Sequence, residues 1–358
     1  MTDVLFLTDE LRFGGAETYY CLISNQLSKQ GIQFHLMHQK GAMSKQLHPD
    51  HQITHLTKSH VRNLQLIRGV IQGEQITIVH ANSLRMLLYC LVVQRSIRRK
   101  LVVLYTKHNI TLLEKYAPRI YTYILNHHVF TTIALSLSEQ ERLLLQGISA
   151  SKLAVVYNGV DLEQFSVKQK RVNASTYRIG MLARLSKEKN PLFFLEVMEA
   201  FKEDDSFHFY MGGDGPERAR VEDEIVARGL EDNVTLMGHI ERPKEFLEEM
   251  DVLVLPSHRE VLPMVLLESL AVGTNVVVID RGGIREVISD EQVGFIIKEH
   301  DKEAFAQCIR TLCSDRDLRH SMSKRGRQRV EQNFSIEKML ESTYGQYAKS
   351  KTSSGGLD

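Results

Sequence analysis

The chain has 358 residues, with 45 lysines and arginines against 44 aspartates and glutamates. This length favours two domains, each large enough to bury its own core. No apolar run approaches the roughly 20 residues of a membrane-spanning helix, and the N-terminus lacks the basic region of a signal peptide. The four cysteines show neither disulfide nor metal-site spacing, which indicates a cytoplasmic protein with reduced thiols.

The near-neutral net charge conceals an asymmetry between the two halves. Residues 1–170 hold 19 lysines and arginines against 11 acids, whereas the remainder holds 26 against 33. A basic half beside an acidic half suggests that one domain faces an anionic partner. Drift in surface composition is the alternative. We expect no nucleic-acid partner.

Short apolar runs alternate with helical stretches along the first half. The expected strands are residues 3–8, 32–37, 76–80, 101–106, 131–134 and 153–157, and the clearest helices are 16–30 and 138–146. Buried strands that alternate with helices are typical of a parallel sheet covered on both faces. A polar stretch at 166–176 is the expected linker.

A second, similar series follows. Its expected strands are 177–182, 207–211, 234–237, 252–255 and 275–279, followed by helices 303–313, 315–332 and 336–348. The sequence therefore predicts two doubly wound α/β domains with a cleft between them, at residues 1–165 and 166–335. The helix 336–348 is expected to pack back on the N-terminal domain, and 349–358 to form a mobile tail.

Two acids separated by seven residues, Glu260 and Glu268, are the most informative feature. Glu260 follows an apolar run, and Glu268 lies on the helix that Pro263 is expected to open. Carboxylates accept hydrogen bonds from hydroxyl groups, and the free amides of a helix N-terminus bind phosphate. The spacing therefore predicts a site for a phosphorylated, polyhydroxylated ligand.

Glycine pairs follow three of the expected strands, at 14–15, 212–213 and 282–283. Paired glycines let the backbone approach a ligand, although the first pair lacks the dehydrogenase spacing and is equally consistent with a tight turn. Arg184 and Lys189 follow another strand and can hold a diphosphate. Two basic loop residues are also typical of solvated surface.

His80 and His108 each lie at the end of an expected strand. A single histidine is usually a structural side chain, but a position at the ligand-binding edge of a sheet favours function. Both roles remain open for His108.

Taken together, these motifs resemble the retaining glycosyltransferases of family GT4. The resemblance spans nearly the whole chain and includes the segments 14–17, 158–161, 213–216, 260–268 and 282–283, with His108, Arg184 and Lys189. It implies the GT-B fold, in which two Rossmann-like doubly wound parallel-sheet domains face each other across a cleft. The C-terminal domain would bind a nucleotide sugar and the N-terminal domain the acceptor.

The resemblance also assigns roles to single residues. Arg184 and Lys189 would hold the donor diphosphate, Glu268 would accept hydrogen bonds from the ribose, and Glu260 would contact the donor sugar. His108 would lie near the reaction centre. The other implied donor-binding positions are Leu262, Pro263, Met264 and Val265 at the helix start, Ile240 beside the base, and Gly15 facing the diphosphate. The implied reaction uses neither a metal ion nor a cofactor.

Two positions depart from the family pattern. Val261 stands where a glycine often follows the first glutamate, and Asn190 stands where a glycine often follows the lysine. Neither change removes a charged group. Val261 narrows its loop and is expected to affect which sugar fits.

The basic segments 95–100 and 116–128 suit contact with an anionic lipid surface. Many relatives act on lipid-linked sugars at the inner face of the membrane. The resemblance therefore implies a UDP-sugar donor and a lipid-linked oligosaccharide acceptor for capsule, O-antigen or exopolysaccharide. A soluble acceptor is the alternative.

Two other functions compete with glycosyl transfer. A nucleotide-sugar epimerase of the same fold would need acid and base groups around the second sugar carbon, which the sequence does not identify. A catalytically silent partner subunit has little reason to retain Glu260, Glu268, Arg184 and Lys189 together.

Overall fold

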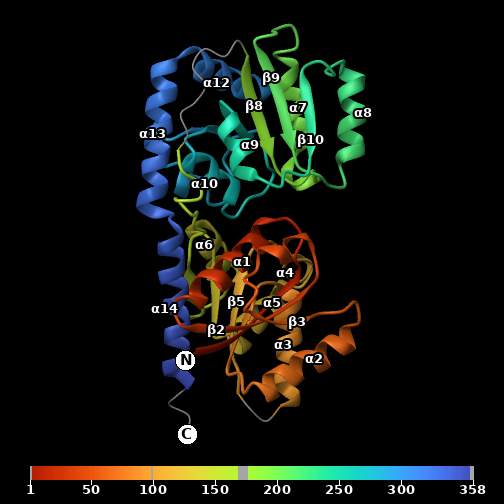
Figure 1. Ribbon diagram of the computed structural model, residues 1–358, viewed down its shortest axis with the longest axis vertical. Coiled ribbons are helices and arrows are strands. Elements are labelled where there is room, and N and C mark those ends of the chain that lie inside the picture. Colours follow the sequence, from red (N-terminus) through yellow and green to blue (C-terminus); the bar gives the residue numbers. More distant parts are fainter. Residues whose placement is uncertain (1, 98–99, 168–175, 355–358) are drawn as a thin grey trace. The chain divides into compact units, whose positions relative to one another are not determined.

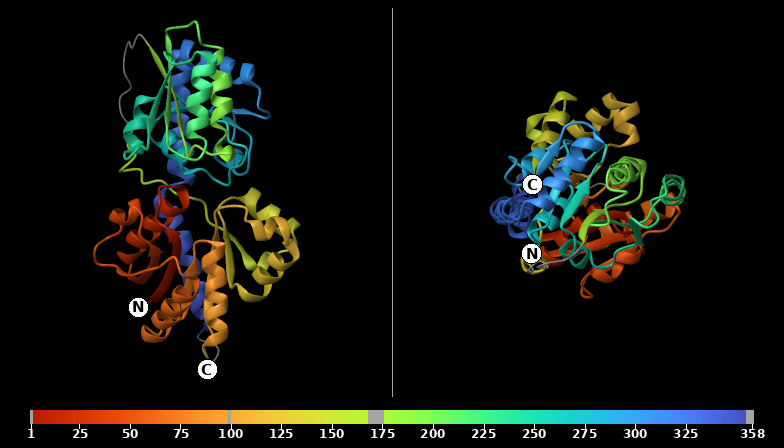
Figure 2. Two further views of the ribbon diagram at one scale, coloured as in Figure 1. Left: turned by 90° about the vertical axis from the view of Figure 1, so that its right-hand side faces the viewer. Right: turned by 90° about the horizontal axis from the view of Figure 1, so that it is seen from above.

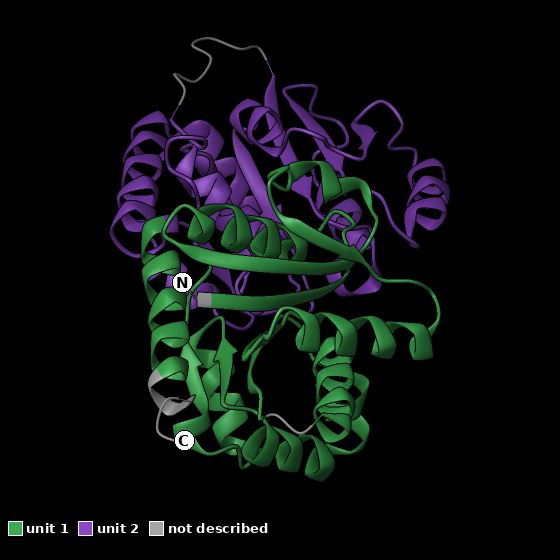
Figure 3. Cartoon of the chain, turned by 60° about the horizontal axis from the view of Figure 1, so that its bottom comes forward, with its two compact units in different colours: residues 1–158, 337–358 green, residues 159–336 purple. Residues whose placement is uncertain are grey.

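The computed structural model describes residues 2–97, 100–167 and 176–354. It divides into two compact units, residues 1–158 with 337–358, and residues 159–336 (Figure 3). The division after residue 158 precedes the expected boundary at 165. Most of the expected linker, residues 168–175, lies outside the described residues.

Unit 1 is built on a parallel seven-stranded sheet in the order β3-β2-β1-β4-β5-β6-β7 (Figure 1). Its strands are β1 (Thr2–Glu10), β2 (Ile32–Gln39), β3 (Gln52–His55), β4 (Ile78–Ala81), β5 (Val102–Lys107), β6 (Thr131–Ala134) and β7 (Leu153–Val155). The central strands β4 and β6 are buried along their whole length. Strands buried on both faces read as continuous apolar runs, which explains why the sequence reveals them.

Helices connect these strands and cover the sheet (Figure 2). They are α1 (Gly15–Ser28), α2 (His60–Gly73), α3 (Leu84–Ser96), α4 (Leu112–Tyr116), α5 (Pro118–His128), α6 (Leu137–Leu145) and α14 (Ile336–Ser354), with short 3₁₀ turns η1 (Ala42–Gln46) and η2 (Ala150–Lys152). Ser59, Ser83, Thr111 and Ser136 each accept a hydrogen bond from the first turn of the helix that follows. These side chains satisfy backbone donors that the helix leaves free, and so fix where α2, α3, α4 and α6 begin.

Unit 2 contains a parallel six-stranded sheet in the order β10-β9-β8-β11-β12-β13. Its strands are β8 (Tyr177–Leu182), β9 (Phe207–Gly212), β10 (Val234–Gly238), β11 (Val252–Leu255), β12 (Asn275–Ile279) and β13 (Phe295–Ile297). Its helices are α7 (Pro191–Glu199), α8 (Arg218–Arg228), α9 (Pro243–Glu249), α10 (Met264–Ala271), α11 (Ile284–Val287), α12 (Lys302–Ser314) and α13 (Arg316–Asn333), with the 3₁₀ turn η3 (Lys187–Lys189).

The strand order creates one topological switch point in each sheet, between β1 and β4 in unit 1 and between β8 and β11 in unit 2. On either side of such a point the connections leave in opposite directions, and ligands bind beyond the strand C-termini there. The loops that carry Gly15, Arg184, Lys189 and Glu260 all leave from strands at these two points.

The structure confirms the expected fold class, and every expected strand overlaps an observed one. The short strands β3 and β13 were not expected. Helix α10 begins at Met264, one residue after Pro263, which is its N-cap. Helix α14 continues to Ser354, beyond the expected end at 348, and residues 355–358 lie outside the described part.

The C-terminal helix α14 belongs to unit 1, where a buried hydrogen-bond chain attaches it to the sheet. The Tyr347 hydroxyl lies 2.6 Å from His80 Nδ1, and His80 Nε2 lies 2.7 Å from Thr106 Oγ1. All three side chains are buried. Because a buried polar group without a partner is costly, this chain ties α14 to β4 and β5.

Tyr347→Phe should lower the free energy of unfolding by about 1–3 kcal/mol, because it leaves His80 Nδ1 buried without a partner. Urea denaturation measures the change. Tyr344→Phe is the matched control on the same helix, since Tyr344 is exposed, and its effect should stay within about 0.5 kcal/mol. Equal effects of the two variants would show that the hydroxyl chain does not hold α14.

Candidate functional site

The loops at the C-terminal edge of the unit 2 sheet are held together by backbone hydrogen bonds. On one side, the amide of Ala183 donates to Gly212 (3.1 Å) and the amide of Gly213 donates to Gly238 (2.6 Å). On the other side, the amide of His258 donates to the carbonyl of Glu188 (2.8 Å), which joins the loop after β11 to the loop after β8. The amide of Gly283 donates to the carbonyl of Val261 (2.8 Å), which joins the loop after β12 to the loop after β11. The loops after β8, β9, β10, β11 and β12 therefore form one connected surface.

Two glycines make this close packing possible. Gly213 has φ +128° and Gly282 has φ +57°, values that side chains rarely adopt. A Cβ at Gly213 would overlap the carbonyl oxygen of Ala183, and one at Gly282 would overlap that of Glu260. These glycines bring loops together, which is a structural role that the glycine pairs alone did not reveal.

The structure pairs two of the expected site residues directly. Lys189 Nζ lies 2.7 Å from Glu260 Oε1, with the lysine side chain 26% exposed and the glutamate 6% exposed. A carboxylate this deeply buried needs a cationic partner. Lys189 therefore neutralises Glu260 and fixes its orientation, while the partly exposed ammonium group retains donors for a further anion.

Arg184 follows β8 in the same connected surface, and its side chain is exposed. Within the described residues, no carboxylate pairs with its guanidinium and no acceptor hydrogen-bonds it. An unpaired guanidinium offers a planar fork of donors that fits phosphate.

Glu268 lies on α10, is half-buried, and receives no hydrogen bond from any described residue. Burial disfavours the charged form and raises the pKa of its carboxyl to about 7. Glu260 is therefore satisfied by Lys189, whereas Glu268 is an open acceptor.

The start of α10 adds backbone donors to this edge. Leu262 and Met264 are buried, and the amide of Leu266 donates to Pro263 (3.2 Å). The amides of Met264 and Val265 find no backbone acceptor among the described residues, as expected for a first helical turn. Ile240, in the loop after β10, lies against Gly212 at the end of β9. A Cβ added at Gly212 would overlap the Ile240 side chain.

The corresponding edge of unit 1 carries His108, just after β5. Its Nε2 lies 2.7 Å from Oδ1 of Asn82, a buried residue just after β4. Asn82 in turn donates to the carbonyl of Ala16 (2.9 Å), next to Gly15 at the start of α1. Burial lowers the pKa of His108 to about 3, with a further contribution from Lys107. The imidazole is therefore neutral at physiological pH.

A cluster of four charged side chains, three of them buried, lies beside His108. Lys107 is fully buried, and its Nζ lies 2.7 Å from Glu114 and 3.2 Å from Glu139. Arg142 lies 2.6 Å from each of the same two acids. Lys107 also donates to the carbonyl of Asn109 (2.7 Å). The cluster therefore fixes the loop that carries His108.

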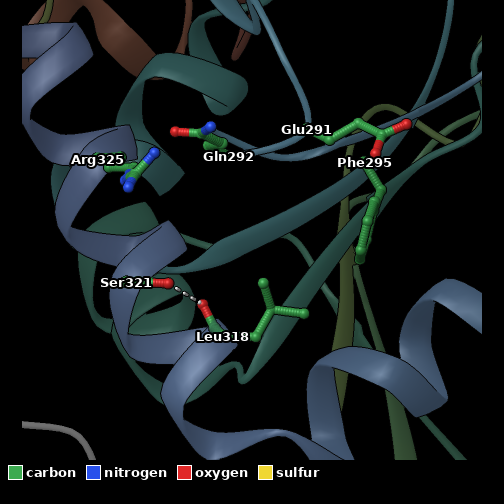
Figure 4. Close-up of a pocket in the computed structure, with 6 residues that line it drawn as sticks. All are labelled: Glu291, Gln292, Phe295, Leu318, Ser321 and Arg325. Carbon is green, nitrogen blue, oxygen red and sulfur yellow. Dashed lines mark hydrogen bonds between the residues drawn. The ribbon is translucent and has the colours of Figure 1, made fainter.

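Two hollows also occur, and the first lies at this same edge of the unit 1 sheet. A cavity of about 190 Å³ in unit 1 is lined by charged and polar side chains that include Asp9, Lys58 and Arg85. A shallower one of about 380 Å³ in unit 2 is lined by Glu291, Gln292, Phe295, Leu318, Ser321 and Arg325 (Figure 4). Phe295 begins β13, so the second hollow lies at the N-terminal edge of the sheet, opposite the connected loops.

Three or more metal-ligating side chains do not come together in the described part of the chain, and metal independence stays a prediction. No helix among the described residues has the length and apolarity to cross a membrane. Sequence reasoning missed the roles of Asn82 and Lys107, although each lies at a strand end, as His80 and His108 do.

Two parallel α/β units of this kind are the two domains of the GT-B fold. Two family models match consecutive parts of the chain, "Glycosyltransferase Family 4" at residues 13–164 and "Glycosyl transferases group 1" at residues 163–329. The chain belongs to the GT4-type glycosyltransferases.

Two glycosyltransferases from Escherichia coli are similar in sequence to this chain. It is 32% identical over 203 residues to a putative colanic acid biosynthesis glycosyltransferase, WcaL, of Escherichia coli K12, covering 54% of this chain and 50% of the relative. It is 28% identical over 207 residues to an Escherichia coli UDP-Gal:alpha-D-GlcNAc-diphosphoundecaprenol alpha-1,3-galactosyltransferase, covering 54% and 53%. The matches thus span about half the length of these relatives.

Among solved structures, Anabaena Alr3699/HepE in complex with UDP and glucose superposes with a TM-score of 0.83. The match covers 97% of this chain and 100% of that one at 18% sequence identity. This likeness shows that the two proteins share the fold.

Glu268→Gln should stabilise the protein selectively at high pH. The pKa of Glu268 rises from its usual 4.5 to about 7 on folding, so the native state holds this proton more tightly. The contribution of Glu268 to the free energy of unfolding therefore falls as pH rises from 4.5 to 7, and it stays constant above pH 7. Between pH 5 and pH 8 the variant should gain at most about 3 kcal/mol over wild type in urea unfolding.

The exposed Glu303 on α12 is the matched control. Glu303→Gln should show no such pH-dependent gain. If Glu268→Gln behaved like the control, the carboxyl of Glu268 would not be held in a desolvated environment.

Proposed function

We propose that this chain transfers a hexosyl unit from a UDP-sugar to a hydroxyl group of a saccharide, with retention of configuration. The observation that carries the proposal is the set of unsatisfied groups on one connected surface. Arg184 is an unpaired cation, Glu268 is an open acceptor, and the first amides of α10 are free. A nucleotide sugar offers complementary phosphates and hydroxyls.

The cations supply the electrostatic part of catalysis. As the glycosidic bond to the diphosphate breaks, the leaving group gains negative charge. Fixed cations aimed at that charge lower the barrier. Arg184 would bind the diphosphate as a fork, and Lys189 would share its ammonium between the diphosphate and Glu260. Because two cations of the chain neutralise the diphosphate, the proposal needs no metal ion.

The two acids hold the two sugars of the donor. Glu268 would accept hydrogen bonds from the ribose hydroxyls, and Glu260 would do so from the transferred sugar. Because Glu260 is buried and paired with Lys189, it suits a positioning role better than nucleophilic attack. Retention then follows from attack on the donor's front face, with the leaving phosphate taking the acceptor proton.

We propose a lipid-linked saccharide as the acceptor, because the name of the Escherichia coli galactosyltransferase specifies a diphosphoundecaprenol-linked sugar for that protein. The support in this chain is a set of exposed apolar side chains on α4 and α5. They are Leu112 and Tyr116 on α4, and Ile120 and Tyr123 on α5, of which Leu112 is 75% exposed. Within each helix the two residues lie about one turn apart, and the basic residues Lys115 and Arg119 are close to them in the sequence. Exposed apolar side chains with basic neighbours suit the surface of an anionic membrane.

UDP should raise the midpoint of thermal unfolding more than GDP or ADP does, because a ligand that binds only the folded state stabilises it by mass action, by about 2.7 kcal/mol at 100 times the dissociation constant. Arg184→Ala should weaken UDP binding about 10- to 100-fold, the usual worth of a hydrogen bond to a charged group. Thermal shift and isothermal titration give these values, and release of UDP from UDP-glucose reports turnover.

Arg325→Ala is the matched control, since Arg325 lines the hollow at the opposite edge of the sheet (Figure 4). It should bind UDP as wild type does. Unchanged affinity in Arg184→Ala would remove the diphosphate assignment, and a larger shift with GDP or ADP would remove the choice of UDP.

The membrane proposal predicts that the protein co-sediments with phosphatidylserine-containing vesicles at low salt and dissociates as salt rises. Leu112→Asp with Tyr116→Asp should reduce the bound fraction at least about tenfold, because each charge is costly in the acyl region. Val226→Asp, a substitution of an exposed apolar residue on α8, is the control. Wild type that stays in the supernatant at low salt would contradict the membrane proposal and leave the donor site untouched.

A further inference from the structure

Two histidines at neighbouring strand ends of unit 1 differ in how completely their rings are satisfied. His80 uses both nitrogens, Nδ1 with Tyr347 and Nε2 with Thr106. His108 uses only Nε2, which lies 2.7 Å from Oδ1 of Asn82. No described residue hydrogen-bonds Nδ1 of His108. That atom is accessible to solvent. His80 is therefore a structural side chain, whereas His108 keeps one ring nitrogen open.

The surroundings of Asn82 allow only one orientation of its amide. Asn82 is buried, and its Nδ2 lies 2.9 Å from the carbonyl oxygen of Ala16 and 3.3 Å from Thr8 Oγ1. A backbone carbonyl can only accept a hydrogen bond. A flipped amide would place two acceptor oxygens against each other inside the protein, so the NH₂ group must face Ala16.

This orientation determines the proton on His108. With the NH₂ group committed to Ala16, Asn82 presents only an oxygen to Nε2 of His108. An amide oxygen accepts, so Nε2 must carry the proton and donate it. In the neutral imidazole the other nitrogen, Nδ1, is then an acceptor.

We propose that Asn82 is a positioning residue that holds His108 in the Nε2-protonated tautomer, so that Nδ1 accepts a hydrogen bond from a carbohydrate hydroxyl. This inference rests on the proposed function for its substrate. The tautomer itself follows from the hydrogen bonds of unit 1 alone.

Asn82 is well placed for this role because it joins three segments. Thr8 lies on β1, Ala16 lies in the first turn of α1, and His108 follows β5, while Asn82 itself follows β4. Its backbone amide is fixed as well, by donation to the carbonyl of Leu7 (2.8 Å). The orientation of His108 is thereby tied to the loop that carries Gly15.

The charge cluster fixes His108 from the opposite side. Lys107 holds the carbonyl of Asn109, and Glu114 accepts a hydrogen bond from the amide of Thr111 (3.3 Å). The backbone on both sides of His108 is therefore anchored. Asn82 then determines which ring nitrogen of His108 carries the proton.

The tautomer can be measured directly by long-range ¹H–¹⁵N NMR on protein labelled at histidine, with His108→Gln used to assign the His108 signals. We expect His108 to show a protonated Nε2 and an unprotonated Nδ1 at neutral pH. The opposite tautomer in wild type would overturn the proposal. This measurement needs no substrate, so it tests the tautomer independently of the proposed function. Failure of the proposed function would instead appear as absence of UDP binding by the wild-type protein.

Two variants separate positioning from folding. Asn82→Leu removes the acceptor, so the His108 signals should shift to a mixture of tautomers and UDP release from UDP-glucose should fall about tenfold or more. Asn82→Asp keeps an acceptor oxygen for Nε2 and should retain the Nε2-protonated signal, although it loses the donor to the carbonyl of Ala16 and should therefore be less stable. A His108 tautomer that is unchanged in Asn82→Leu would contradict the proposal. If the variants do not fold, the wild-type spectrum still decides the tautomer.

Discussion

The parallel direction of the strands is the constraint on which the rest of this structure depends. Because every strand in a sheet runs the same way, all their C-terminal ends meet at one edge, and each chain connection must start there. In unit 2 this edge gathers loops from five strands and joins them by backbone hydrogen bonds. Residues far apart in the sequence, such as Lys189 and Glu260, thereby become neighbours on a rigid surface. The beginnings of helices face the same edge, so free amides and side chains of both charges collect in one place.

The fully buried lysine at these edges is paired with acids. In unit 1, Lys107 is fully buried, and it is accommodated because Glu114, Glu139 and a backbone carbonyl receive its donors. Removing one member of such a cluster leaves an uncompensated charge, which is far more costly than removing the whole cluster. The cluster therefore makes the loop after β5 stiff, and that stiffness is what allows a single hydrogen bond to orient His108. The Lys189–Glu260 pair plays the same part in unit 2.

The sequence was sufficient to predict most of the fold because the inner strands are buried on both faces and appear as continuous apolar runs. It missed β3, whose residues are mostly exposed, and β13, which is only three residues long. The motifs fall on loops that the structure gathers at the C-terminal edges of the two sheets. The pairings were out of reach, because the contact between Lys189 and Glu260 joins residues 71 positions apart and depends on how two loops pack. The same reason hid the role of Asn82, whose importance comes from three partners on other elements.

Groups with and without hydrogen-bond partners occur side by side in both units. His80 has a partner on each ring nitrogen and Glu260 is paired with Lys189, whereas Glu268 and Nδ1 of His108 have no partner among the described residues. A desolvated carboxyl without a partner raises the free energy of the folded chain, and natural sequences retain such local costs mainly at functional sites. A donor that supplies hydroxyl groups to Glu268 would remove part of that cost on binding. Under the proposed function, ligand affinity and protein stability would therefore be coupled through the same carboxyl group, and a variant that stabilises the free protein at position 268 should bind the donor less tightly.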